Sequence, residues 1–274
     1  MLNFLGLSRS NYYQVKKRPV SQSEMKKQVL KLQIKKLWQA SKQIYGAPKI
    51  THELRKHGFC VAVKTVGNYM REMGLHAHYI KPWTVTTRDS DYDEQLSNVL
   101  NEQFNPVRPN AAWCIDTTYI PTREGFAYLT SVMDLYSRRI LAWDLSDNLE
   151  VANVIPLIER IKDVRNIDQP LIIHSDRGSQ FTSKYYRQVT SDLVRSYSKK
   201  AFPWDNACIE SFHALIKREW LNHFDIASIK EAHRLVFEYI DTFYNTIRIH
   251  SHCGYMSPND FEAKYYQSVT PSAA

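Results

Sequence analysis

Hydrophobic positions follow one spacing in the first part of the chain and another in the rest. Between residues 21 and 73 apolar residues recur three or four positions apart among lysines, a spacing typical of helices. From Pro106 onward apolar and polar positions alternate and aromatic residues become frequent, as in half-buried strands. The pattern predicts an all-helical N-terminal module followed by an α+β domain, with residues 81–105 as a linker.

The N-terminal module, residues 1–80, is expected to contain three main helices. They are predicted at about residues 21–41, 50–57 and 63–73, and Gly74 closes the last one. The second and third helices are joined by a short link that contains a glycine, which is the layout of a helix-turn-helix. A helical hairpin that only packs, without a DNA partner, is the alternative.

In a helix-turn-helix the second helix enters the major groove of DNA. Lys64, Asn68 and Arg71 lie on the helix that would do so, and Lys49 lies at the start of the preceding helix. We therefore predict these four side chains as contacts to bases or phosphates.

The α+β domain is expected to begin with three consecutive antiparallel strands. Strands are predicted at residues 113–120, 126–133, 140–145, 171–173 and 193–197, and helices at 150–164, 183–191 and 206–221. This order, β-β-β-α-β-α-β-α, is that of the ribonuclease H-like fold, although no physical rule makes it unique to that fold. We assign residues 106–222 to a mixed-sheet core and residues 223–274 to a C-terminal helical extension of it.

Net charge is +8, and its distribution along the chain is uneven. Residues 1–88 contain seventeen Lys and Arg residues against three acidic residues, whereas the remainder is acidic on balance. A basic module suits a polyanionic partner, because each neutralised phosphate releases condensed counterions. A solvated basic face with no partner is the alternative, and nucleic acid is the prediction we adopt.

Other bulk features exclude several classes of protein. Uninterrupted apolar stretches stay well short of the length that a membrane-spanning helix needs, and the start at Met1 has no signal-peptide pattern. The four cysteines are scattered without C-x-x-C spacing, which argues against a disulfide framework or a cysteine zinc site. We expect a reduced, cytoplasmic protein with no membrane partner.

Three carboxylates stand in positions that suggest chemistry. Asp176 follows the short apolar run at residues 171–173, and open α/β sheets usually place their reactive groups at the carboxyl ends of strands. Asp116 lies within a predicted strand and Glu210 on a predicted helix. A buried carboxylate needs a partner or a metal ion, so these three are candidates for one site.

Five motifs together carry a family resemblance: WCIDTTYI, DLYSRRI, HSDRGSQF, DNACIESFHALIKRE, and YNTIRIH followed by GYMSPNDF. They closely resemble transposases of bacterial insertion sequences in the DDE superfamily, which are relatives of retroviral integrases. More narrowly, the chain resembles the second-reading-frame product of two-frame elements. The resemblance implies a ribonuclease H-like integrase catalytic core in which Asp116, Asp176 and Glu210 form the metal-binding triad.

The chemistry of those three residues agrees with that implication. Phosphodiester cleavage and strand transfer by a 3′ hydroxyl are served by two Mg²⁺ ions about 3.5–4 Å apart, with Mn²⁺ as a substitute. Mg²⁺ prefers hard oxygen ligands, and this set has no His or Cys. Further predicted DNA contacts are Arg177 beside Asp176, and three residues on the face of the Glu210 helix: Asn206, His213 and Lys217.

The resemblance implies a DNA transposase subunit that cuts at insertion-sequence ends and performs strand transfer. Its expected partners are double-stranded DNA at element ends and target, further copies of itself, and a first-frame partner or fusion. Thirty-three residues separate Asp176 from Glu210, two fewer than the family pattern, which leaves a shortened loop and an inactive copy both open. A metal-dependent ribonuclease H-like nuclease and a non-catalytic DNA-binding regulator are the other functions considered.

Two further aspartates are expected to be structural. We predict that Asp134 pairs with Arg138 or Arg139, which follow it closely. Asp205 is expected to cap the N-terminus of the helix that carries Glu210.

Overall fold

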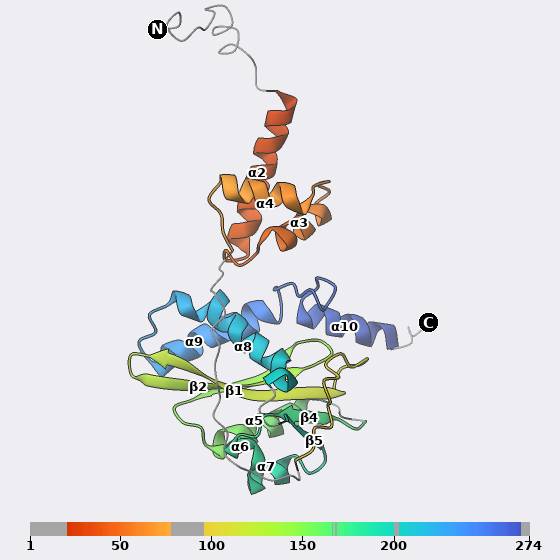
Figure 1. Ribbon diagram of the computed structural model, residues 1–274, viewed down its shortest axis with the longest axis vertical. Coiled ribbons are helices and arrows are strands. Elements are labelled where there is room, and N and C mark those ends of the chain that lie inside the picture. Colours follow the sequence, from red (N-terminus) through yellow and green to blue (C-terminus); the bar gives the residue numbers. More distant parts are fainter. Residues whose placement is uncertain (1–20, 78–95, 166, 168, 200–202, 270–274) are drawn as a thin grey trace, which may run out of the picture. The chain divides into compact units, whose positions relative to one another are not determined.

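The computed structural model describes residues 21–77, 96–165, 167, 169–199 and 203–269 (Figure 1). The chain divides into two compact units, the first ending at residue 77 and the second beginning at residue 78. In the described part, no helix combines the length and apolar character needed to cross a membrane.

The first unit is a cluster of helices: α2 (Gln22–Ala40), α3 (Ala47–Lys56) and α4 (Val63–Glu72). Their bounds lie within a few residues of the predicted ones. Ile34 of α2, Ile50 and Leu54 of α3, and Val66 of α4 are fully buried, so a small apolar core holds the three helices together. Gly58 has φ +82°, a left-handed conformation that favours glycine, and it turns the chain between α3 and α4.

The second unit is built on a five-stranded mixed sheet: β1 (Ala112–Thr122), β2 (Gly125–Asp134), β3 (Ile140–Ser146), β4 (Ile172–Ser175) and β5 (Val194–Tyr197). The strand order is β3-β2-β1-β4-β5. The first three strands are antiparallel, β4 runs parallel to β1, and β5 runs parallel to β4. This is the predicted ribonuclease H-like α+β core, with all five strands close to where the sequence placed them.

Helices cover both faces of this sheet: α5 (Val151–Val164), α6 (Ser179–Thr182), α7 (Lys184–Val189), α8 (Ala207–Glu219), α9 (Ile229–Tyr239) and α10 (Pro258–Val269). In Figure 1, α5, α6 and α7 lie on one face, and α8 and α9 lie on the other. Single 3-10 turns flank α8, at Pro203–Asn206 and Leu221–His223, and a π-helical turn, Ile240–Tyr244, continues α9.

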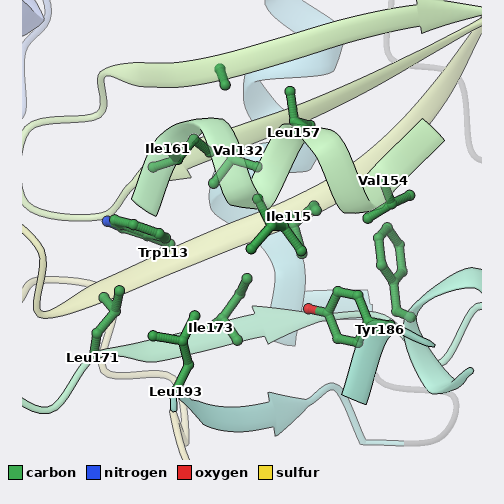
Figure 2. Packing of buried hydrophobic residues seen from close by; sticks show 13 residues of the cluster. Trp113, Ile115, Val132, Val154, Leu157, Ile161, Leu171, Ile173, Tyr186 and Leu193 are labelled. Carbon is green, nitrogen blue, oxygen red and sulfur yellow. The ribbon is translucent and has the colours of Figure 1, made fainter. Parts of the chain in front are cut away.

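The main core lies between the sheet and α5 (Figure 2). Trp113 and Ile115 of β1 point into it and meet Leu157 and Ile161 of α5 and Ile173 of β4. Side chains alternate along a strand, so the residues between them must point to the opposite face. This alternation directs Asp116 to the side of the sheet that α8 covers.

Residues 96–105 belonged to the predicted linker, and the structure places them against β5. Leu100 is 2% exposed, and its N–H donates to Ser196 Oγ at 2.9 Å. The N–H of Tyr197 donates to the carbonyl of Ser97 at 3.0 Å. This segment is therefore packed on the edge of the second unit, and the rest of the predicted linker, up to residue 95, lies outside the described residues.

The predicted cap at Asp205 is wrong. Asp205 lies in the 3-10 turn before α8, and its Oδ2 accepts the N–H of Lys199 at 2.7 Å. Asn206 is the N-cap residue of α8 and makes no side-chain capping bond. The 3-10 turn moves Asp205 out of the capping position, and its carboxylate instead closes the loop that precedes the helix.

Asp134 is structural, as predicted, but its predicted partners are wrong. Its carboxylate is fully buried and accepts the N–H of Asn110 at 2.8 Å, and the N–H and Oγ–H of Ser137 at 2.9 and 3.0 Å. The arginine side chains bind elsewhere: Arg138 to Asn105 Oδ1 and Arg139 to Glu262 Oε1. Burial raises the pKa of Asp134, and the donors partly offset that rise.

Candidate active site

The register of β1 and β4 brings two of the three predicted carboxylates together. β4 pairs with β1 through Ala112 to Cys114, and Cys114 stands opposite His174. Continuing this parallel register by two residues sets Asp116 beside Asp176, just past the end of β4. The side of β1 next to the end of β4 is thus the place where the site forms.

Asp176 is held by the turn that follows β4. Its Oδ1 accepts the N–H of Gly178 at 2.9 Å. Burial raises the pKa of Asp176 to about 6, and the negative charge of Asp116 adds to the rise, whereas the Gly178 N–H opposes it. The folded protein therefore disfavours the ionised form of this carboxylate.

Glu210, in the first turn of α8, completes the set. Burial is the largest cause of its raised pKa, and the negative charges of Asp116 and of Asp176 add to the rise. The effect of the two aspartates on the pKa of Glu210 indicates that the start of α8 lies near them. α8 packs on β1 and β2, which explains why its N-terminal turn reaches this side of the sheet.

The donor chemistry of these residues fits a hard divalent cation. All three side chains offer carboxylate oxygens. Burial, and after it the charge of neighbouring carboxylates, raises the pKa of Asp176 and of Glu210, and a bound cation would offset both effects. Among the described residues, however, no three His, Cys, Asp or Glu side chains stand together in positions that could hold a metal ion. The three carboxylates are near one another without forming a closed ligand cage.

His213 is a neighbour of Asp116 rather than an exposed group of α8. It is 4% exposed, its Nδ1 lies 3.4 Å from Asp116 Oδ2, and its Nε2 lies 3.4 Å from Ser131 Oγ. The N–H of Thr117 donates to the other oxygen, Asp116 Oδ1, at 2.8 Å. Both oxygens of Asp116 thus have neighbours that orient the carboxylate.

Lys217, predicted as a DNA contact, is half-buried. Its Nζ donates to Thr118 Oγ1 at 2.7 Å and lies 4.5 Å from the centre of the Tyr119 ring. Burial lowers the pKa of Lys217, and the charge of Asp116 opposes this effect. Thr118 was missed as part of the site, although strand alternation places it on the same face as Asp116.

The other predicted DNA contacts near the site have protein partners or are buried. Arg177 donates through Nε to the carbonyl of Ser198 at 2.9 Å and through Nη2 to that of Leu96 at 3.3 Å. Asn206 is 3% exposed at the start of α8. These contacts show how both residues shape the surroundings of the carboxylates, and their contact with DNA stays a prediction.

In the first unit, the three side chains predicted to enter the major groove are all exposed on the same helix. Lys64, Asn68 and Arg71 are exposed on α4, and Arg71 Nη1 donates to Asn68 Oδ1 at 3.2 Å. Lys49 of α3 is half-buried, with its Nζ 5.0 Å from the centre of the Tyr45 ring. The basic and polar groups of α4 are therefore available to a partner.

Replacing Asp176 by Asn is expected to stabilise the metal-free protein at neutral pH. A raised pKa means that the folded state disfavours the ionised form, so the penalty develops as pH rises from about 4 and is complete above about 6. Asn keeps an acceptor for Gly178 and removes the charge. Thermal unfolding in EDTA should show a gain on the order of 1–3 kcal/mol at pH 8.

The gain should shrink near pH 4, where the wild-type carboxylate is protonated in the folded state. Adding Mg²⁺ at pH 8 should stabilise the wild type more than Asp176→Asn. Parallel stability profiles for the two proteins across this pH range would contradict the raised pKa of Asp176 in the folded state.

Comparison with known proteins agrees with the two units. A family model described as an HTH-like domain matches residues 24–83, and two models described as an integrase core domain match residues 106–198 and 191–258. Among solved structures, the chain is similar to a simian T-cell lymphotropic virus intasome (12% identity, TM-score 0.49, 88% of this chain and 76% of that chain). It is also similar to the HTLV-2 integrase catalytic core domain in complex with magnesium (15% identity, TM-score 0.43, 57% of this chain and 98% of that chain).

Relatives with higher sequence identity are insertion-sequence proteins. The chain is 36% identical over 252 residues to the transposase for insertion sequence element IS904 of Lactococcus lactis, covering 88% of this chain and 96% of the relative. It is 32% identical to the IS600 uncharacterized 31 kDa protein of Shigella sonnei, covering 97% and 99%. It is 36% identical to transposase InsF for insertion sequence IS3A of Escherichia coli, covering 82% and 78%. The chain therefore belongs to the family of insertion-sequence transposases that place an HTH-like domain ahead of an integrase core domain.

Proposed function

We propose that this chain catalyses metal-dependent cleavage at the ends of an insertion sequence and joins the freed 3′ hydroxyl to target DNA. The observation that carries the proposal is the proximity of Asp116, Asp176 and Glu210, each of which comes from a different element. Their carboxylates would hold two Mg²⁺ ions, or Mn²⁺ in substitution. When bound, such ions supply an activated nucleophile and neutralise charge on the entering and leaving oxygens.

The surrounding residues would keep the triad in position. The Thr117 N–H and the His213 ring flank the two oxygens of Asp116, and the Gly178 N–H fixes one oxygen of Asp176. Such contacts orient carboxylates before a ligand arrives, so little reorganisation is needed when substrate binds. Glu210 on α8 is partly buried but is the most exposed of the three carboxylates, so it is the member free to adjust.

Lys217 is suited to hold a phosphate of the scissile strand. Its Nζ is near enough to Asp116 for that charge to act on its pKa, and its bond to Thr118 is with a neutral hydroxyl. A phosphate offers a stronger, charge-assisted bond than a hydroxyl does. We propose that Lys217 exchanges the hydroxyl of Thr118 for the DNA backbone.

The first unit would bring the enzyme to double-stranded DNA, with Lys64, Asn68 and Arg71 of α4 in the major groove. Joining two element ends uses two 3′ hydroxyl groups, so we propose that copies of the chain assemble on DNA. A first-frame partner or fusion remains part of this proposal. Action on bacterial DNA places the protein in the cytoplasm, associated with the nucleoid.

The test is a joining assay with paired insertion-sequence end DNA, a target plasmid and Mg²⁺ or Mn²⁺. A transposase converts end DNA into joined product, whereas a structure-selective nuclease yields only cut DNA, and a regulator binds without cutting. The assay should compare this chain alone with a fusion to the first-frame product. Absence of joined product from both forms, with either metal, would overturn the proposed activity.

Replacing Lys64 by Ala is expected to weaken DNA binding and to reduce its salt dependence. Each lost phosphate contact lowers the slope of log affinity against log salt concentration by about 1. Lys64→Arg should keep the slope, because it keeps the charge. Lys230→Ala, which removes an exposed lysine of α9 in the second unit, is the matched control. An unchanged slope in Lys64→Ala would exclude this side chain as a phosphate contact.

A further inference from the structure

The end of the β1–β2 hairpin extends beyond the rest of the sheet. β4 pairs with β1 only from Ala112 to Cys114, and β3 pairs with β2 only as far as Tyr128. The pairs nearer the turn, down to Thr122 with Gly125, belong to β1 and β2 alone. We refer to residues 119–128 as the hairpin arm.

One face of the arm is covered by protein. Ile120 and Ala127 stand opposite each other, and each is 1% exposed. At the turn, the N–H of Arg123 donates to the carbonyl of Ile226 at 2.9 Å, and the Arg123 guanidinium pairs with Asp225. These contacts attach the arm to the segment between α8 and α9, so its position is fixed.

The opposite face of the arm carries aromatic side chains that protein does not cover fully. Tyr119 pairs with Tyr128, and Pro121 pairs with Phe126, so alternation puts all four on this face. Tyr119 is 51% exposed and Phe126 is 57% exposed. Their rings meet edge to face, with centroids 5.4 Å apart. Two large aromatic rings thus lie against each other at the surface.

The arm is linked to the proposed catalytic carboxylates through Lys217. Tyr119 is three residues beyond Asp116, which is about 10 Å along an extended strand, and alternation directs its side chain to the opposite face of β1. The Nζ of Lys217 lies 4.5 Å from the centre of the Tyr119 ring and bonds to the adjacent Thr118. A cation that responds to the charge of Asp116 therefore also stands over an exposed aromatic ring.

We propose that Tyr119 and Phe126 form a stacking site for an unpaired base of the DNA that enters the active site. The inference rests on the proposed function, because it takes DNA as the substrate. Aromatic faces stack on bases of any sequence, and the adjacent lysine attracts the phosphate on the same nucleotide. Exposed aromatic rings beside a positive charge suit a nucleotide as partner, because it offers both a flat base and a negative charge. They suit an apolar protein surface less well.

The site takes a base that is out of its duplex, because only an unstacked base has a free face. An element end that frays near the carboxylates would present such a base. Stacking on Tyr119 and Phe126 would replace part of the base stacking lost on separation. The arm would thereby favour frayed or single-stranded ends over intact duplex.

The test uses full-length protein in EDTA and a DNA duplex with a single-stranded overhang that contains 5-iodouracil. This base forms a photo-cross-link preferentially with an aromatic ring on which it stacks. Peptide mapping should find the cross-link at Tyr119 or Phe126. Tyr119→Leu and Phe126→Leu should lower the affinity for the overhang DNA by about tenfold and leave the affinity for a blunt duplex nearly unchanged.

Two controls separate stacking from loss of structure. Tyr119→Phe keeps the ring and should keep both cross-link and affinity, and Phe237→Leu removes an aromatic ring of α9 that is 50% exposed and should change neither. Thermal unfolding should show that the Leu variants are folded. Cross-links that map elsewhere, or overhang binding that is unaffected in both Leu variants, would overturn the stacking site. Because cleavage is absent in EDTA, failure of the proposed enzymatic activity leaves this result unaffected.

Discussion

Replacing Asp116 or Asp176 by Asn, or Glu210 by Gln, is expected to abolish cleavage of insertion-sequence end DNA in Mg²⁺ or Mn²⁺. Each carboxamide keeps the shape of the side chain and removes the charge that would hold the metal. A bound metal supplies several kcal/mol of transition-state stabilisation, which corresponds to a loss of about 100-fold or more. Gel-resolved cleavage under single-turnover conditions measures the rate.

The same three variants should bind DNA almost as tightly as the wild type, because the basic α4 helix lies in the other unit. Glu159→Gln is the matched control, since Glu159 is an exposed carboxylate of α5 outside the triad. It should cleave at the wild-type rate. A triad variant that cleaves at a rate near that of the wild type would show that its residue is not a metal ligand.

Residue periodicity predicted the five strands and most of the helices of the fold, but not α6 or α10. Alternation predicted β1, β2 and β3 within two residues of their observed ends, and the predicted helix at residues 150–164 matches α5. These predictions succeed because burial on one face of an element leaves a direct pattern in the sequence. The packing of residues 96–105 against β5 left no such pattern, because that short segment is held mainly by backbone bonds and by Leu100.

The sequence predicted three residues of the candidate site, and their membership stays a prediction. It did not predict which side chains surround them. Motifs identified Asp116, Asp176 and Glu210, and the register of β1 and β4 now gives a physical reason for the proximity of the two aspartates. Helical spacing correctly put His213 and Lys217 on the same face as Glu210. It could not predict that His213 is buried against Asp116, or that Thr118 accepts from Lys217, because spacing within α8 does not reveal what stands opposite.

A buried ion pair fixes the C-terminal end of α8, the helix that carries Glu210. Arg248 donates through Nε and Nη2 to the two oxygens of Glu219 at 2.7 and 2.6 Å. The hydroxyl of Tyr239 donates to the same carboxylate at 2.6 Å. Glu219 and Arg248 are each 5% exposed. The pair therefore joins α8 to α9 and to the segment that follows the π-helical turn.

Replacing Arg248 by Met is expected to destabilise the protein by about 3–5 kcal/mol, because it removes the cation that binds both oxygens of the buried Glu219 carboxylate. A buried carboxylate that loses its cation has a raised pKa, so the penalty is present at neutral pH and is relieved as pH falls and Glu219 takes up a proton. Urea denaturation of the two proteins at pH 7.5 and at pH 5 measures both effects.

Two matched variants test whether loss of the cation beside Glu219 is what destabilises Arg248→Met. Arg234→Met removes an arginine whose pairing on α9 is exposed, and it should change stability by less than about 1 kcal/mol. Combining Glu219→Met with Arg248→Met removes both charges, so the double variant should be more stable than Arg248→Met alone, since apolar residues often replace a buried pair at little penalty. If the double variant is as unstable as Arg248→Met at both pH values, lost packing rather than the buried charge of Glu219 accounts for the destabilisation. The ion pair would then not be what holds α8 in place.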